Sequence, residues 1–207
     1  TYVPEDDNKD NAYVEFNLSD YDKKDSELIY YSSVEEAILN SPLNAENEEF
    51  SVPEDFLNHV DEILHIWNGK QYDTIFYRAG SDNDPVQGFV MARCKKQVEE
   101  ASVQYAFMNA TPVTTKADSI LISDITELIH SSLKLSDFQQ DLNPNYPDTR
   151  FVFGYAHDKE IYSLEVEGQK PDGVIEINVY DRTMYLWYYD DLKSDKRGNN
   201  LSYSVDV

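Results

Sequence analysis

The stretch Ile63-Leu-His-Ile-Trp-Asn-Gly-Lys-Gln-Tyr-Asp-Thr-Ile-Phe-Tyr77 places two apolar and aromatic runs on either side of Asn68-Gly69. Asn-Gly is the dipeptide most typical of a tight β-hairpin turn, because both residues tolerate positive φ angles. The pattern therefore predicts a strand over 63–67, a turn, and a second strand over 72–77. A helix with Gly69 just beyond its last residue would explain the same glycine. We favour the hairpin and keep the helix as the alternative.

Two more runs of this kind follow, at Val86–Lys95 and Val103–Asn109. Together with the hairpin they predict a small antiparallel meander. The only cysteine of the chain, Cys94, alternates with Val90 and Ala92 in the first run. This spacing predicts a buried structural thiol rather than a nucleophile. A single cysteine also excludes an internal disulfide, and its spacing to other residues indicates no zinc site.

Helix-start signals lie on both sides of the meander. Ser33-Val-Glu-Glu36 and Ser51-Val-Pro-Glu54 fit capping boxes, which predict a short helix to about Asn40 and a second one ending near Asp61. Asp124-Ile-Thr-Glu127 predicts the start of a third helix. Its apolar stripe would consist of Ile125, Leu128, Ile129 and Leu133. His130 would lie toward the end of that helix, where a protonated imidazole favours the helix dipole.

The chain beyond Leu142 is predicted to be β structure. Leu142-Asn-Pro-Asn-Tyr-Pro-Asp148 contains two prolines in four residues, which favours a turn-rich boundary between subdomains. Five strand candidates follow it, at 150–157, 161–166, 174–180, 184–189 and 201–207.

The whole sequence therefore predicts an α+β protein in three parts. Residues 1–27 would be an acidic, flexible N-terminal segment. Residues 28–142 would form an α+β subdomain, with the antiparallel meander and two or three short helices. Residues 148–207 would form a small all-β, sandwich-like subdomain.

The charge of the chain restricts its partners. It has 17 Lys and Arg against 40 Asp and Glu, a formal net charge of −23, and residues 1–50 hold 14 of the acidic but only 3 of the basic residues. Phosphate backbones and anionic headgroups repel such a protein, so we expect no nucleic-acid binding. No apolar run reaches the length of a transmembrane helix, so we expect no membrane insertion within 1–207. The start at Thr1 without Met is interpreted as a hint of processing and export.

No motif in the sequence names a reaction. None of the four histidines belongs to an HExxH pattern, and there is no GxSxG elbow, SxxK pair or Walker loop. We therefore predict no catalytic residue, no metal ligand and no cofactor, and expect a non-enzymatic protein. With 40 acidic residues, carboxylate pairs for hydrolysis carry no information, although a hydrolase is a third class of function to consider.

The first part of the meander resembles uncharacterised exported lipoproteins of Gram-positive bacteria. In them an apolar strand and an aromatic strand, here Ile63–Tyr77, precede a strand that starts with Gly-Phe, here Gly88-Phe-Val-Met-Ala-Arg93. Lys95-Lys96 falls where the lysine turn of that pattern stands.

The C-terminal part is similar to the closing β module of the same proteins. The matching residues are Phe153-Gly-Tyr155 and Ile161-Tyr-Ser-Leu-Glu-Val-Glu-Gly168, through Tyr185-Leu-Trp-Tyr188. The resemblance implies an extracytoplasmic protein, anchored at the cell surface through a removed N-terminal segment. It implies no catalytic residue, because these families have no established activity.

Tyrosine is frequent, at 16 residues, and its ring with a polar tip suits binding faces. Alternation over 184–189 places one set of side chains on each face of a strand, and which face is core stays open. The candidate binding residues are Trp67, Tyr185, Trp187 and Tyr189. The first hypothesis is a non-enzymatic binding protein for another protein or a cell-surface ligand. The alternative is an acidic immunity- or inhibitor-type protein that binds a basic protein partner.

Overall fold

The computed structural model describes residues 24–41, 56–80, 86–99, 101–112, 124–141, 150–180, 182–196 and 200–206, without the side chains of 135–141. Positions 1–23 of the predicted flexible segment lie outside these residues. The capping box at 51–54 and the boundary at 142–148 also lie outside them. The class of the fold is α+β, as predicted.

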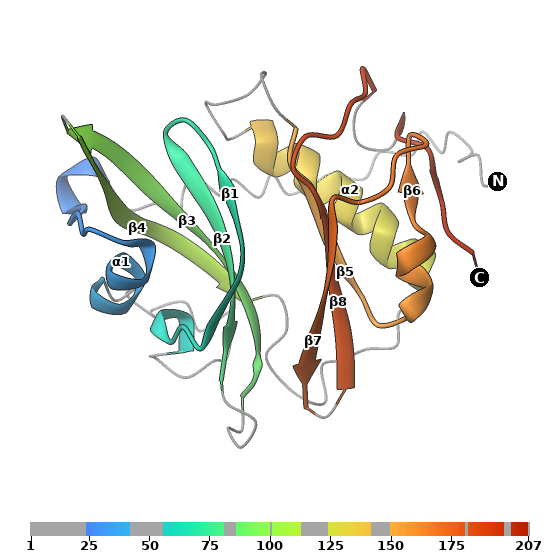
Figure 1. Cartoon of the computed structure of the whole chain (residues 1–207), viewed down its shortest axis with the longest axis horizontal. Coiled ribbons are helices and arrows are strands. Elements are labelled where there is room, and N and C mark those ends of the chain that lie inside the picture. The colour runs from blue at the N-terminus through green and yellow to red at the C-terminus, as the bar shows by residue number, and fades with distance from the viewer. Residues whose placement is uncertain are drawn as a thin grey trace, which may run out of the picture. The chain divides into compact units, whose positions relative to one another are not determined.

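The Asn68-Gly69 hairpin forms as predicted and opens a four-stranded antiparallel sheet (Figure 1). The backbone N–H of Gly69 donates to the carbonyl oxygen of Tyr72 at 3.0 Å, within the turn. The alternative of a helix ending at Gly69 is therefore wrong. The strands lie side by side in chain order: β1 (Glu62–Asn68), β2 (Tyr72–Ala79), β3 (Gly88–Glu99) and β4 (Ser102–Pro112).

Helix α1 (Val34–Asn40) begins at the predicted cap. The Ser33 hydroxyl accepts a hydrogen bond from the backbone N–H of Glu36 at 3.2 Å. A capping box also requires the Glu36 carboxylate to accept from the backbone N–H of Ser33, and this hydrogen bond is not formed. The carboxylate accepts from the hydroxyl and the backbone N–H of Ser32, at 2.6 and 3.3 Å. Ser33 thus satisfies one free N–H of the first turn, while Ser32 donates to the Glu36 carboxylate.

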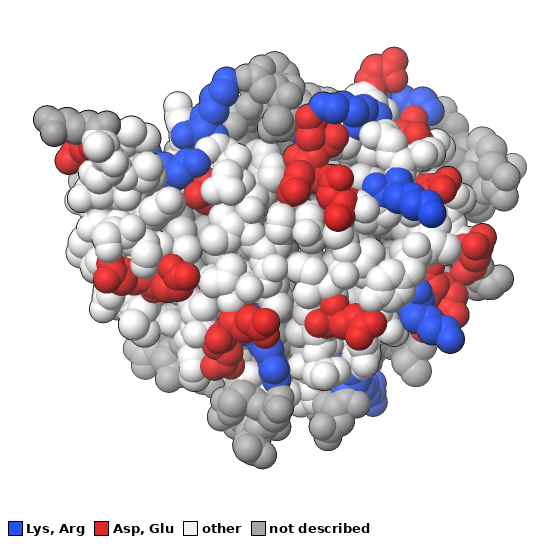
Figure 2. All heavy atoms as spheres, viewed as in Figure 1, with Lys and Arg blue, Asp and Glu red and all other residues white. Residues whose placement is uncertain are grey.

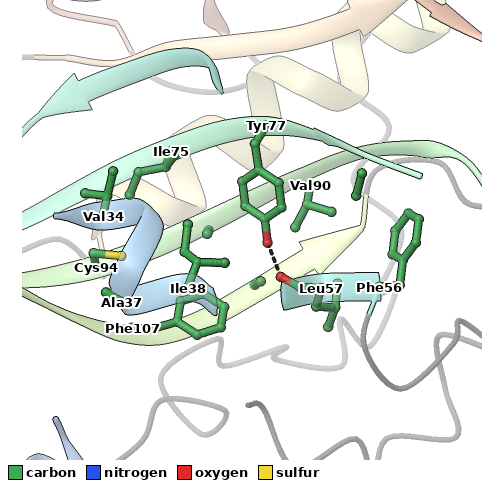
Figure 3. Close-up of a cluster of buried hydrophobic side chains, with 13 residues drawn as sticks. Val34, Ala37, Ile38, Phe56, Leu57, Ile75, Tyr77, Val90, Cys94 and Phe107 are labelled. Atoms are coloured by element: carbon green, nitrogen blue, oxygen red, sulfur yellow. Dashed lines mark hydrogen bonds between the residues drawn. The ribbon is translucent and has the colours of Figure 1, made fainter. Parts of the chain in front are cut away.

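Helix α1 and the sheet enclose the first hydrophobic core (Figure 3). Ala37 and Ile38 of the helix are fully buried. Tyr77 extends from β2 into this core, and its hydroxyl donates to the carbonyl oxygen of Leu57. Cys94 is buried here too, as predicted, and its burial raises the pKa of the thiol to about 12.

The predicted helix ending near Asp61 is wrong in its described part. Only η4 (Phe56–Asn58) is helical there, as a single 3-10 turn. The cause lies in the sheet, because the backbone N–H of Asp61 donates to the carbonyl oxygen of Arg78 at 2.9 Å. Strand pairing then begins at Glu62. Pairing with β2 therefore competes with helix formation and takes the residues that a longer helix would need.

The second hydrophobic core lies between α2 (Ile125–Asp141) and a three-stranded sheet. The sheet order is β5 (Val152–Ala156), β8 (Arg182–Tyr189) and β7 (Gly173–Val179). A two-stranded pair, β6 (Glu165–Val166) with β9 (Tyr203–Ser204), accompanies it.

Helix α2 starts as predicted, since Asp124 accepts from the backbone N–H of Thr126 at 2.8 Å. Ile129 and Leu133 are buried. His130 stands early in the helix and not near its end, so its predicted interaction with the helix dipole is wrong. Burial, followed by the nearby charge of Lys134, lowers the pKa of this histidine.

One of the predicted strands is largely a 3-10 turn. Residues Lys159–Ser163 form η6, and only 165–166 of the predicted strand 161–166 are extended. Local hydrogen bonds explain the difference: the Ser163 hydroxyl donates to the carbonyl of Glu160 at 2.7 Å, and the N–H of Leu164 donates to the carbonyl of Ile161 at 3.0 Å.

The chain forms two compact units. Among the described residues, one unit comprises 24–112 with its gaps together with 178–180 and 182–183, and the other comprises 124–141, 150–177, 184–196 and 200–206. Helix α2 thus belongs with the C-terminal strands, whereas the predicted boundary grouped it with the meander. The sandwich-like arrangement of 148–207 stays a prediction. No helix among the residues that the structure describes is long and apolar enough to span a membrane.

Candidate functional site

The four aromatic residues predicted to bind a ligand all lie inside the protein. Trp67 is 7%, Tyr185 9%, Trp187 0% and Tyr189 2% exposed. Both faces of β8 are buried, because Met184 and Leu186 on its other face are also fully inaccessible.

Their contacts are those of packing residues. Trp187 and Tyr189 meet edge to face, with ring centroids 6.2 Å apart. The Tyr189 hydroxyl donates to the carbonyl of Gln169 at 2.9 Å and accepts from the N–H of Val166 at 3.2 Å. These residues therefore present no open aromatic surface, and a binding role for them stays a prediction.

One tyrosine among the described residues is exposed, and sequence reasoning did not single it out. Tyr162 stands in η6 and is 51% exposed. Ile161 beside it and Leu164 two residues later are fully buried. These two apolar side chains fix the turn to the core, and the turn holds Tyr162 in solvent.

The Tyr162 side chain is positioned by two strands. Its hydroxyl donates to Oε1 of Glu176, on β7, at 2.9 Å. Its ring stands edge to face against Tyr185 of β8, with centroids 5.6 Å apart and an interplanar angle of 76°. A ring fixed in this way loses little conformational entropy when a ligand binds. The hydrogen bond to Glu176, followed by burial, raises the pKa of Tyr162, so the hydroxyl stays protonated.

Three carboxylates lie near enough to Tyr185 to raise its pKa. The pKa of Tyr185 is raised by burial and then by the negative charges of Glu176, Glu160 and Asp158. Asp158 and Glu176 are exposed, and Glu160 is half-buried. Acidic side chains form several separate groups on the face of the molecule shown in Figure 2, between stretches of neutral surface.

We call four residues the Tyr162 surface, namely Asp158, Glu160, Tyr162 and Glu176, and the buried Tyr185 supports its ring. None of its carboxylates forms an ion pair within the described part of the chain. Lys159 in the same turn supplies one positive charge against three carboxylates, which leaves the surface with excess negative charge. An exposed ring near carboxylates that have no ion-pair partner among the described residues is suited to a cation.

The most buried ion pair described has a different character. Lys96 Nζ lies 2.7 Å from Asp73 Oδ1, and Asp73 is 1% exposed. The backbone N–H of Gly69 donates to the same carboxylate at 3.2 Å, and Lys96 also donates to the carbonyl of Gly69. Every partner belongs to the strands around the β1–β2 turn. This pair therefore fixes the hairpin.

Metal chemistry finds no support in the described residues. Among them, no three His, Cys, Asp or Glu side chains are grouped so as to hold an ion.

Comparison with protein-family models, curated proteins and solved structures finds no match. The resemblance to exported lipoproteins therefore stays an expectation. Any function has to be argued from the chain's own residues, and the Tyr162 surface is the best-defined exposed cluster that they provide.

Sequence reasoning missed this surface because Ile161-Tyr162-Ser163-Leu164 alternates between apolar and polar residues, which is typical of a strand. The available signal was Asp158, a residue type favoured before the first turn of a helix. It occupies that position before η6.

Proposed function

We propose that this chain is a non-enzymatic binding protein whose Tyr162 surface binds a cationic segment of a partner protein. The observation that carries the proposal is a single exposed tyrosine, held by Glu176 and Tyr185 among carboxylates without ion-pair partners in the described part of the chain. The proposal joins the two binding hypotheses drawn from the sequence, because it combines an aromatic contact with a basic partner.

The chemistry of the surface favours lysine or arginine. A cationic side chain over an exposed tyrosine ring gains about 0.5–1 kcal/mol. Carboxylates beside the ring add attraction to the same charge, and Glu176 has a second oxygen in addition to the one that accepts from Tyr162. The net charge of −23 attracts cationic partners from a distance and raises their association rate.

The proposed setting is extracytoplasmic, with the protein anchored at the cell surface. This part of the proposal is supported by the resemblance to exported lipoproteins. Fractionation of cells that express the full-length protein provides the test. Recovery with the membrane or wall fraction is expected, and recovery with the cytosol would contradict the location.

The binding proposal is tested with a synthetic cationic peptide, Val-Lys-Val-Lys-Val-Lys-Val, titrated into the protein by calorimetry. Tyr162→Ala should weaken binding about fivefold, the equivalent of about 1 kcal/mol. Glu176→Gln should weaken it to a similar extent, and added salt should weaken binding to the unaltered protein.

The matched control is Glu99→Gln, which removes one exposed negative charge from the end of β3. This variant should bind the peptide within about twofold of the unaltered protein, because Glu99 is not part of the Tyr162 surface. Equal losses for all three variants would indicate unspecific attraction by the net charge. No binding, or binding that Tyr162→Ala leaves unchanged, would contradict the proposed function.

A further inference from the structure

The outer edge of β7 lies directly beside the Tyr162 surface, because Glu176 belongs to both. β7 ends the sheet order β5-β8-β7, and no described strand pairs with its other side. The outward N–H and C=O groups of an edge strand are a template for another extended chain. Residues 173–177 of this strand belong entirely to the C-terminal unit, so the edge that they form lies within one compact body.

Outer strands elsewhere in the two larger sheets carry features that hinder pairing. β1 has an irregularity between Ile63 and His65. β4 is already paired at Tyr105 with Tyr31, whose backbone N–H groups each donate to the other's carbonyl at 2.8 Å. β5 is only five residues long. Short length, bulges and coverage are common ways of protecting an edge strand.

β7 lacks most of the sequence features that protect an edge, and its one charged residue is Glu176. Its seven residues, Gly173-Val-Ile-Glu-Ile-Asn-Val179, contain neither lysine nor proline, the two residue types that most often block such an edge. They include four β-branched residues, which favour the extended conformation. The strand is therefore suited to accept a neighbour.

The charge of the protein decides which neighbour fits. A second copy paired antiparallel about the strand centre would place Glu176 opposite Glu176, and like charges directly opposite are destabilising. Each copy also carries a net charge of −23. A second copy is therefore a poor occupant, and an extended segment with lysine or arginine opposite Glu176 is complementary.

We infer that the partner's cationic segment binds as an added β-strand along 173–177. This inference rests on the proposed function and names the conformation and pattern of the partner. A lysine or arginine opposite Glu176 would lie on the face that carries Tyr162. Its two neighbours would lie on the other face of the sheet, beside Ile175 and Ile177, and would be apolar.

The test is amide hydrogen exchange of the whole protein with saturating Val-Lys-Val-Lys-Val-Lys-Val. The outward amides within 173–177 should exchange at least about tenfold more slowly when the peptide is bound. A peptide of the same charge, in which the valine just before the central lysine is replaced by Pro, should bind more weakly and give no such protection, because proline cannot continue a strand ladder. A version with Glu in place of each Lys should not bind.

The outcomes separate the inference from the function on which it rests. Suppose that the peptide binds, and that Tyr162→Ala weakens this binding, while 173–177 gain no protection or the proline peptide binds equally well. That result would overturn the added strand and leave the proposed function intact. Loss of binding altogether would overturn both. If 173–177 are protected in the absence of peptide, and this protection rises with protein concentration, then a second copy is the occupant and the inference is overturned.

Discussion

At the scale of single residues, the buried charge of Asp73 shows how a polar group can fix a turn. Its carboxylate meets the Nζ of Lys96 and the backbone N–H of Gly69 beside the β1–β2 connection. Burial raises the pKa of Asp73, while Lys96 acts in the opposite direction. Transfer of a charge from water into the protein interior is costly, and an unpaired buried carboxylate is more costly still.

Lys96→Met should therefore destabilise the protein by about 2–4 kcal/mol, because it leaves Asp73 buried without its cation. The measurement is the free energy of unfolding in urea at pH 7. The matched control is Lys95→Met, which breaks the pair between Lys95 and Asp25, whose side chain is 78% exposed. An exposed pair contributes about 0–1 kcal/mol. Similar losses for both variants would contradict this account of Asp73.

At the scale of elements, helix α2 approaches β5 at a position where only glycine fits. A Cβ on Gly154 would lie 2.4 Å from both the Ser132 hydroxyl and the Trp187 ring. Ser132 stands on the helix and Trp187 on β8, so the glycine sets the distance at which helix and sheet pack.

Gly154→Ala should cost about 1–3 kcal/mol of unfolding free energy, the usual range for overpacking a core. The comparison is Gly168→Ala, where no atom lies within 4 Å of the added Cβ but φ is +71°. That change should cost about 1 kcal/mol through backbone strain alone. Chemical denaturation of both variants gives the two values. A loss for Gly154→Ala no larger than that for Gly168→Ala would show that the helix shifts without cost.

The elements that could be predicted from the sequence are those that local chemistry determines. Asn68-Gly69 specifies a hairpin by itself, and Asp124 specifies a helix start by accepting from the backbone N–H and the hydroxyl of Thr126. The elements that were missed depend on residues far away in the sequence, whose interactions compete with the local preference. The second predicted helix gives way to pairing with β2, and Ile161–Leu164 satisfies the alternation of a strand while it forms a turn.

The candidate site escapes sequence reasoning for the same reason. Trp67, Trp187 and Tyr189 stand out in the sequence as large aromatics, and their burial removes a large apolar area from water. Tyr162 is exposed because its neighbours Ile161 and Leu164 are more apolar and occupy the interior. Its hydrogen bond to Glu176 joins η6 to β7, and residues 14 positions apart show no relation in a one-dimensional pattern.

At the scale of the whole molecule, the net charge of −23 acts on folding and binding in opposite directions. Self-repulsion destabilises a compact anionic chain, and salt screens that repulsion over about 8 Å at physiological ionic strength. Added salt should therefore stabilise the fold. The same screening weakens the attraction of a cationic partner to the Tyr162 surface. A salt titration that raises the unfolding midpoint while it lowers peptide affinity would separate the two effects.

The dependence of stability on pH follows from the directions of the pKa shifts. Burial raises the pKa of Asp73, so its contribution to stability is fully present at low pH and is lost as pH rises through the raised value. Glu167 behaves in the opposite way. Burial raises its pKa, but hydrogen bonds from Ser202 and the charge of Lys196 outweigh burial, and the pKa is lowered from 4.5. Its contribution is present above pH 4.5 and is lost as pH falls through the lowered value.

Stability should therefore be greatest at mildly acidic pH, roughly 5 to 6, where self-repulsion has begun to fall and Glu167 is still ionised. Glu167→Gln should flatten the decline below about pH 4.5, because a neutral amide cannot lose the charge that attracts Lys196. Urea unfolding midpoints of both proteins from about pH 3.5 to 8 provide the measurement. A maximum above about pH 7 in the unaltered protein would show that paired carboxylates outweigh the repulsion among the unpaired ones, including those of the Tyr162 surface.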